Sequence, residues 1–155
     1  MDIFKFIYSM IIGYSPMLIA KATVPYKNFS GLSCRQIGIV PPEWLFGIVW
    51  AILYFLIGAS FFLYSIAEGD TKEKRAGFIF FGIQLALNAA FIPVYFLFHS
   101  LFGGFIICIL ITIFLIFTLI KFYKISKKAA YLLIPYFLWM IFATILSYKI
   151  YIANN

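Results

Sequence analysis

The longest uncharged segment runs from residue 76 to residue 120, and it constrains the fold more than any other feature of the sequence. A single helix of these 45 residues would be roughly 68 Å long, about twice the hydrocarbon thickness of a bilayer. The segment must therefore reverse its direction. We expect the reversal at His99-Ser100, just ahead of Gly103-Gly104. The segment thus predicts two membrane spans joined by a tight turn.

Two further uncharged segments, residues 44–67 and 129–148, are each as long as one membrane span. Of the 155 residues, 65% are hydrophobic and only 11% are charged. A soluble domain of this size could not cover such a sequence with polar surface. The sequence therefore predicts an integral membrane protein.

The N-terminal segment allows two interpretations. Residues 6–20 are uncharged and lie between Lys5 and Lys21, and Ala20-Lys21-Ala22 has the pattern of a signal-peptidase site. We favour a retained helix, because the Lys21 side chain can reach the membrane interface while the following residues complete the span. The fold class is then an all-α bundle in one domain, residues 1–155, with an outer loop at 25–42 and spans near 4–24, 43–66, 76–98, 101–123 and 129–152.

The basic residues indicate how this bundle is oriented. An odd number of spans places the termini on opposite sides of the membrane. If the N-terminus is cytoplasmic, the cytoplasmic side holds Lys5, Lys72, Lys74, Arg75, Lys121, Lys124, Lys127 and Lys128. The other side holds Lys21, Lys27, Arg35 and Lys149. This asymmetry follows the positive-inside rule, so the loop 25–42 and the C-terminus are predicted to be extracytoplasmic. The formal charge of +7 then reflects topology, and we expect no nucleic-acid partner.

The sequence offers little material for metal or ionic chemistry. Its only histidine, His99, is interpreted as solvated at the interface, the alternative being a haem-iron ligand. The carboxylates lie at span ends or in loops, at Asp2, Glu43, Glu68, Asp70 and Glu73. Ion-coupled transporters usually keep an ionisable residue inside the membrane, and none lies centrally in these spans. We therefore expect no metal site, no required cofactor and no ion-coupled transport.

Aromatic and weakly polar residues remain as the candidate site. Phe46, Trp50 and Tyr54 follow one another at intervals of four residues, so they share one helix face. The third span carries a similar face, and Pro93 can kink the helix beside it; that face consists of Gln84, Asn88, Phe91 and Tyr95. The fifth span carries a face made of Tyr136, Trp139, Ala143, Leu146 and Ser147.

The position of each tryptophan along its span distinguishes a membrane-interface anchor from a candidate site residue. Trp44 begins a span and is interpreted as an interfacial anchor, whereas Trp50 and Trp139 lie six or more residues inside their spans. Amides inside a bilayer need partners, so Gln84 and Asn88 are expected to face inward, with Gln84 interpreted as a helix-packing contact. Three aromatic faces converging in a small bundle suit a flat, apolar ligand with a few polar edges.

Three sequence blocks resemble the TspO/MBR family, the translocator proteins. The first is Pro41-Pro42-x-Trp44-x-Phe46-x-x-Val49-Trp50-x-x-Leu53-Tyr54, and the second is Leu87-Asn88 followed by Phe91 and Tyr95. The third is Pro135-Tyr136-x-x-Trp139 with Ala143-Thr144-x-Leu146 and a terminal Asn154. The resemblance covers nearly the whole chain. It is weakest in the first loop, where residues 35–40 replace an aromatic-rich segment.

The resemblance implies a homodimer in a bacterial cell membrane that binds protoporphyrin IX, haem, isoquinoline carboxamides or benzodiazepines. By position, the implied pocket comprises Trp50, Tyr54, Asn88, Phe91, Tyr95, Trp139, Ala143, Leu146 and Ser147. We add Phe46 and Tyr136 from the same faces. The family is also associated with light- and oxygen-dependent porphyrin breakdown, for which Trp50 and Trp139 are the candidate redox residues. The alternative function is transport of tetrapyrroles or other small hydrophobic molecules.

Overall fold

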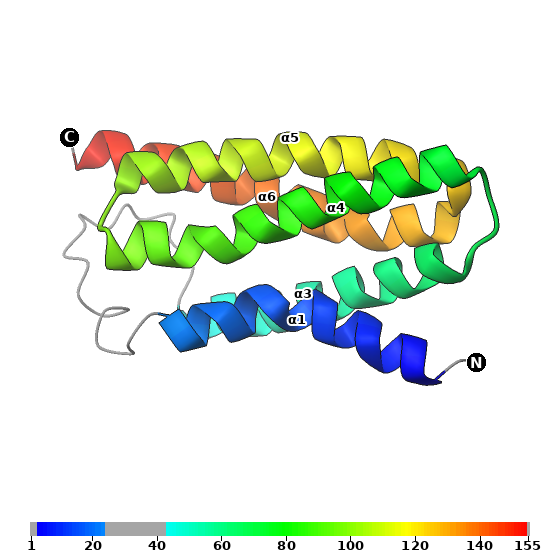
Figure 1. The fold of residues 1–155 in the computed structure, drawn as a ribbon. Coiled ribbons are helices and arrows are strands. Elements are labelled where there is room, and N and C mark those ends of the chain that lie inside the picture. The colour runs from blue at the N-terminus through cyan, green and yellow to red at the C-terminus, as the bar shows by residue number, and fades with distance from the viewer. Residues whose placement is uncertain (1–2, 24–42, 155) are drawn as a thin grey trace.

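The computed structural model of the chain describes residues 3–23 and 43–154. All regular structure in these two ranges is helical, which confirms the all-α class. The helices are α1 (Ile3–Thr23), α3 (Glu43–Ile66), α4 (Thr71–Ile92), the π-helical turn η1 (Pro93–Leu97), α5 (Leu101–Ile125) and α6 (Lys127–Ala153), as Figure 1 shows. With η1 counted as the end of α4, these make five helices long and apolar enough to cross a membrane. The expected outer loop, with Cys34 and the double proline, lies outside the described residues.

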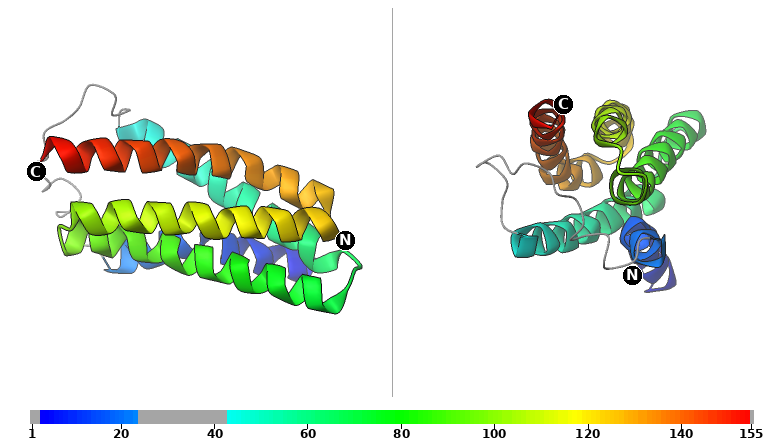
Figure 2. Two further views of the ribbon diagram at one scale, coloured as in Figure 1. Left: turned by 90° about the horizontal axis from the view of Figure 1, so that it is seen from above. Right: turned by 90° about the vertical axis from the view of Figure 1, so that its left-hand side faces the viewer.

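The five long helices form a closed ring. The packed neighbours are α1 with α3, α3 with α6, α6 with α5, α5 with α4, and α4 with α1. Figures 1 and 2 show the helices running up and down the same axis, with the two described ends of the chain at opposite ends of the bundle. We call these the 66–71 end and the 98–101 end, after the short connections found at each.

Local capping sets where the later helices begin. The helix α4 starts at Thr71, five residues before the expected boundary at 76. The Asp70 carboxylate accepts a 2.9 Å hydrogen bond from the Glu73 backbone N–H, and this cap lets a charged turn join the helix. Ser126 caps α6 in the same way, with a 3.4 Å bond from the Ala129 N–H. Apolar length therefore predicts the spans well, but capping extends them into the polar region.

The expected reversal at His99-Ser100 is confirmed. Pro93 opens the single π-helical turn η1, and the Phe98 N–H donates to the Pro93 carbonyl over 3.0 Å. His99 then takes a φ of 49°, the left-handed conformation that turns the chain sharply. The Ser100 hydroxyl accepts a 3.0 Å bond from the Gly103 N–H and starts α5. The two glycines thus lie in the first turn of α5, after the reversal.

Small residues let helices approach closely inside the ring. A Cβ added to Gly13 would lie 2.7 Å from the Gly58 Cα, so α1 and α3 meet backbone to backbone. Cys108 is buried, with its Sγ 3.6 Å from the Ser147 hydroxyl oxygen. Thr112 lies 3.3 Å from Thr144 in the same α5–α6 contact. These residues of α5 therefore pack against α6 within one bundle.

The core near the 66–71 end is built from stacked aromatic rings. Tyr64 and Phe122 stack with centroids 3.7 Å apart and planes 5° apart. Phe81 packs between Phe122 and Phe61, at 5.7 Å and 5.0 Å. The Tyr64 hydroxyl also donates to the Glu73 and Lys74 carbonyls, over 3.3 Å and 3.2 Å. This packing ties α3, α4 and α5 together below the candidate site.

Candidate ligand-binding site

Six of the eleven residues predicted for the site form one connected group inside the ring. Each contacts at least one other member through a ring contact or a hydrogen bond. They come from three helices: Phe46, Trp50 and Tyr54 from α3, Asn88 from α4, and Tyr136 and Trp139 from α6. We call this set the central group. It brings together segments that are up to 93 residues apart in the sequence, from 46 to 139.

Trp50 and Trp139, the two tryptophans inside the membrane spans, form the middle of the aromatic side of the central group. Their rings meet edge to face, with centroids 6.4 Å apart and planes at 85°. Trp50 also stacks on Tyr54 at 5.2 Å, while Phe46 meets Trp139 edge to face at 5.5 Å. Such geometries place the positive edge of one ring on the negative face of another. The result is an aromatic wall that runs from α3 to α6.

Hydrogen bonds connect the polar side of the central group in a single path. Tyr54 donates to Asn88 Oδ1 over 3.0 Å, and Asn88 Nδ2 donates to the Tyr136 hydroxyl over 2.8 Å. Tyr136 in turn donates to Gln84 Oε1 over 3.0 Å. All four side chains are buried, and Gln84 and Tyr136 are fully so. Within an apolar bundle these groups satisfy one another, which fixes the relative positions of α3, α4 and α6.

Two buried N–H donors remain without a partner among the described residues. They are Nε2 of Gln84, at the end of the hydrogen-bonded path, and Nε1 of Trp139, in the aromatic wall. A buried polar group left unpaired costs about 1–3 kcal/mol. Both unpaired atoms are donors. An acceptor oxygen, such as that of a carboxylate or carbonyl, is the kind of group that could pair with them.

The other five predicted residues lie elsewhere on α4, η1 and α6. Phe91 and Tyr95 stack at 5.4 Å and lie over Gly104, where an added Cβ would sit 2.6 Å from the Tyr95 ring. Ser147 faces Cys108 on α5. Leu146 is buried and Ala143 is half-buried on the same helix as Ser147. The structure thus joins Phe91, Tyr95 and Ser147 to α5.

Gln84 faces inward, as expected, and its bond from Tyr136 makes it a contact between α4 and α6. Sequence reasoning missed two other neighbours of the central group. Tyr14 on α1 lies 5.9 Å from the Tyr54 ring and donates to the Ala51 carbonyl over 2.9 Å. Phe142 lies 5.2 Å from Trp139. A polar-edged ring in the middle of an apolar span was the available signal for Tyr14.

The side chains of this arrangement are of the kinds that can bind an apolar ligand and transfer an electron. The central group contains no charged side chain, so it provides apolar contact, stacking and neutral hydrogen bonds. Its indoles and phenols are also oxidisable side chains, and they lie in ring contact. Trp50 contacts Tyr54, Tyr136 and Trp139 within 6.4 Å.

A closed ring of five membrane-length helices around this aromatic interior defines a multi-pass helical membrane protein. The sequence model of the TspO/MBR family matches residues 7–152 of the chain. The chain therefore belongs to that family. The chain is 34% identical to the tryptophan-rich protein TspO of Chlorobaculum tepidum, over 74% of this chain and 72% of the relative. It is 37% identical to a tryptophan-rich protein TspO of Archaeoglobus fulgidus, over 74% of this chain and 72% of the relative. It is 31% identical to the human translocator protein, over 74% of this chain and 69% of the relative.

Proposed function

We propose that the protein binds porphyrin-type ligands, such as protoporphyrin IX or haem, against the aromatic wall of the central group. The observation that carries the proposal is the edge-to-face pair of Trp50 and Trp139, in which the buried Trp139 indole N–H lacks a partner among the described residues. A tetrapyrrole is flat and apolar, and its acidic edges supply acceptor oxygens. Membership of the TspO/MBR family supports the same ligand class.

The packing of the central group supports one placement of such a ligand. Tyr54, Asn88 and Tyr136 are bonded to one another and are at most 6% exposed, so they form a closed floor. Trp50 and Phe46 lie one and two turns nearer the start of α3 and are half-buried. The ligand therefore stacks on the Phe46–Trp50 side, toward the 98–101 end, and the Trp139 indole N–H donates to one of its oxygens. Isoquinoline carboxamides and benzodiazepines carry a carbonyl that fits the same donor.

Titration in lipid nanodiscs tests this proposal. Protoporphyrin IX, haem and an isoquinoline carboxamide are added to the parent protein and to Trp50→Ala, with tryptophan fluorescence and porphyrin absorbance as readouts. Trp50→Ala removes a stacking surface and is expected to weaken porphyrin binding about tenfold. Trp44→Ala is the matched control, because Trp44 is 66% exposed at the start of α3. Equal binding by the parent and Trp50→Ala would refute the placement.

Light-dependent porphyrin breakdown is the second candidate function. The supporting observation is the continuous contact among oxidisable rings, in which Trp50 meets Tyr54, Tyr136 and Trp139. An excited porphyrin stacked on this wall can accept an electron from an indole and pass it to dioxygen, which is the oxidant for the breakdown. The neighbouring rings can share the indole radical that remains. Illumination of the purified protein with protoporphyrin IX tests it. Loss of the Soret band faster than in matched empty nanodiscs favours catalysis, and equal bleaching favours binding alone.

We also propose a homodimer in a bacterial cell membrane, with the N-terminus cytoplasmic and the C-terminus extracytoplasmic. Eight of the twelve basic residues then lie on the cytoplasmic side. Since Cys108 and Gly104 are used inside the bundle, the dimer contact must use another face. Native mass spectrometry from mild detergent and from nanodiscs reads the mass directly. A monomeric mass under both conditions would contradict the dimer.

A further inference from the structure

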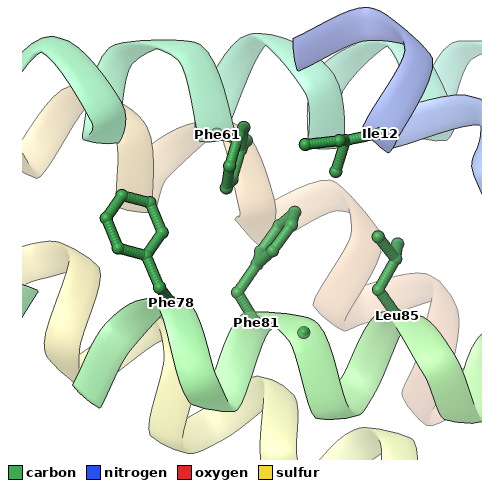
Figure 3. A pocket seen from close by; sticks show the side chains of 6 residues that line it. Ile12, Phe61, Phe78, Phe81 and Leu85 are labelled. Atoms are coloured by element: carbon green, nitrogen blue, oxygen red, sulfur yellow. The ribbon is translucent and has the colours of Figure 1, made fainter. Parts of the chain in front are cut away.

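An apolar hollow lies between α1, α3 and α4. It is an open groove of about 390 Å³ and is lined by Ile12, Phe61, Phe78, Phe81, Gly82 and Leu85. Figure 3 shows the side chains of α4 facing Phe61 and Ile12 across it, with Phe78 and Leu85 at its two ends. We call it the α4 groove. Its lining contains no polar side chain.

A polar hollow continues from one end of the α4 groove. It encloses about 550 Å³ at the 66–71 end and is lined by Ile66, Ala67, Glu68, Gly69, Thr71, Lys74, Arg75 and Phe78. Phe78 lines both hollows, so the apolar groove and the polar mouth meet at this ring. The α4 groove suits the acyl chain of an amphipathic lipid, and the charged mouth suits its headgroup.

The charges of the mouth favour an anionic headgroup. Two cations, Lys74 and Arg75, line it together with one acid, Glu68. Arg75 is exposed, and its guanidinium can bind a phosphate through two parallel N–H donors. Lys74 Nζ is held over the end of α3 by bonds of 2.9 Å and 2.6 Å to the Ser65 and Ala67 carbonyls. An ammonium has three donors, so one remains for a headgroup oxygen.

The neighbouring acid Glu73 does not neutralise this mouth. Its carboxylate lies 2.9 Å from Lys121 Nζ and 3.6 Å from Lys124 Nζ on α5. It is therefore engaged in the α4–α5 contact, and it is not among the residues that line either hollow. The lining of the mouth therefore keeps two cations, Lys74 and Arg75, against the single acid Glu68, which leaves an excess of one positive charge.

The length of the α4 groove fits one leaflet. Phe78 and Leu85 are seven residues apart on α4, which corresponds to about 10 Å along the helix. One leaflet contributes about half of the roughly 30 Å hydrocarbon layer. A headgroup at Arg75 would lie at the interface, and its acyl chain would follow the groove for most of the leaflet. Gly82 keeps the path open, since a Cβ added there meets nothing within 4 Å.

We propose that the α4 groove and its basic mouth bind one anionic phospholipid, with the phosphate at Lys74 and Arg75 and one acyl chain along Phe78, Gly82 and Leu85. The site is separate from the central group and does not depend on the proposed porphyrin binding. Basic pockets between membrane helices commonly bind anionic headgroups on the cytoplasmic side, which is the side assigned to this end by the charge asymmetry.

Native mass spectrometry of the full chain tests the lipid site. Phosphatidylglycerol or phosphatidylcholine with identical acyl chains is added in mild detergent, and the bound fraction is measured across a concentration series. The parent is expected to bind phosphatidylglycerol at least about fivefold more tightly than phosphatidylcholine. Arg75→Gln should remove about fivefold of the phosphatidylglycerol affinity and leave phosphatidylcholine unchanged. Gly82→Leu should weaken both lipids, because it fills the chain path.

Two matched variants complete the design. Lys128→Gln removes one exposed charge from α6, and Gly47→Leu adds the same side chain at another exposed glycine whose Cβ position is open. Both should bind like the parent. If Gly82→Leu fails to fold, Ile12→Phe fills the groove from its opposite wall. Equal affinity of the parent for the two lipids, or a folded groove-filling variant that binds phosphatidylglycerol like the parent, would overturn the proposal.

Discussion

The Tyr54 hydroxyl on α3 donates a 3.0 Å hydrogen bond to Oδ1 of Asn88 on α4. These two helices are consecutive in the sequence, but they are not neighbours in the ring. There α3 packs against α1 and α6, and α4 packs against α1 and α5. The bond therefore crosses the interior of the bundle. Asn88 also donates to Tyr136, so a single amide connects α3, α4 and α6. In a bilayer no water replaces such a partner, which makes this relationship the main polar constraint on the site.

Removing one end of this path should measure its strength. Tyr54→Phe keeps the ring and deletes the hydroxyl, and it is expected to lower the free energy of unfolding by about 0.6–1.7 kcal/mol. Asn88→Leu deletes two bonds and should cost roughly twice as much. Unfolding in mixed micelles of mild detergent and sodium dodecyl sulfate, followed by circular dichroism, provides the measurement. Tyr131→Phe, at an exposed tyrosine, should change stability by less than about 0.5 kcal/mol. Equal stability of all four proteins would show that the path contributes nothing.

Much of the fold could be predicted because apolar length and charge position are read directly from the sequence. The reversal at His99-Ser100 is where an uncharged segment of twice the membrane thickness must turn. The exact start of α4 could not be predicted from apolar length, since the cap at Asp70 draws a charged turn into the helix. Capping acts through a local hydrogen bond and is independent of the apolar pattern.

The site was harder to predict, because helical spacing identifies a shared face but not what that face meets. The spacing of Tyr136, Trp139 and Ser147 placed all three on one side of α6. In the structure α6 packs against both α3 and α5, so this side meets different neighbours along its length. Trp139 meets Trp50 on α3, whereas Ser147 meets Cys108 on α5. Trp139 and Ser147 can therefore be assigned to different surroundings only when the packing of the five helices is known.

Close backbone contact between α1 and α3 gives a second stability prediction. A methyl group at Gly13 would lie 2.7 Å from the Gly58 backbone, and a backbone cannot yield as a flexible side chain can. Gly13→Ala is therefore expected to cost about 1–3 kcal/mol of unfolding free energy. Gly47→Ala is the matched control, because its Cβ position is open and alanine favours a helix by up to about 1 kcal/mol. Thermal unfolding in detergent compares them, and a Gly13→Ala variant as stable as the parent would contradict the contact.

The proposed orientation predicts selective labelling of the two cysteines. A membrane-impermeant thiol reagent added to intact cells should modify Cys34, which the charge asymmetry places outside the cell. Cys108 should stay unmodified, since it is only 2% exposed and its Sγ lies 3.6 Å from the Ser147 hydroxyl. Mass spectrometry of the labelled protein identifies the modified residue. If Cys34 reacts in detergent but not in intact cells, the orientation is reversed.

The last prediction concerns Trp139, whose indole N–H is buried without a partner among the described residues. Trp139→Phe removes this unpaired donor and keeps a ring beside Trp50 and Phe46. The loss of packing volume and the removal of an unpaired polar group oppose each other, so the unfolding free energy should change by less than about 1.5 kcal/mol. Porphyrin affinity should fall about fivefold, because stacking is retained while a hydrogen bond to the ligand is lost.

The same variant separates binding from photochemistry. Phenylalanine is much harder to oxidise than tryptophan. If the Trp139 indole exchanges an electron with the excited porphyrin, Trp139→Phe should therefore slow the light-dependent loss of the Soret band by far more than fivefold. The measurement is made at saturating porphyrin, so that weaker binding does not contribute. Trp44→Phe, which changes an exposed tryptophan outside the central group, should leave both binding and bleaching unchanged. Bleaching of saturated Trp139→Phe at the parental rate would refute a redox role for this indole and leave only its role in binding. A variant that unfolds would instead show that Trp139 is needed for packing.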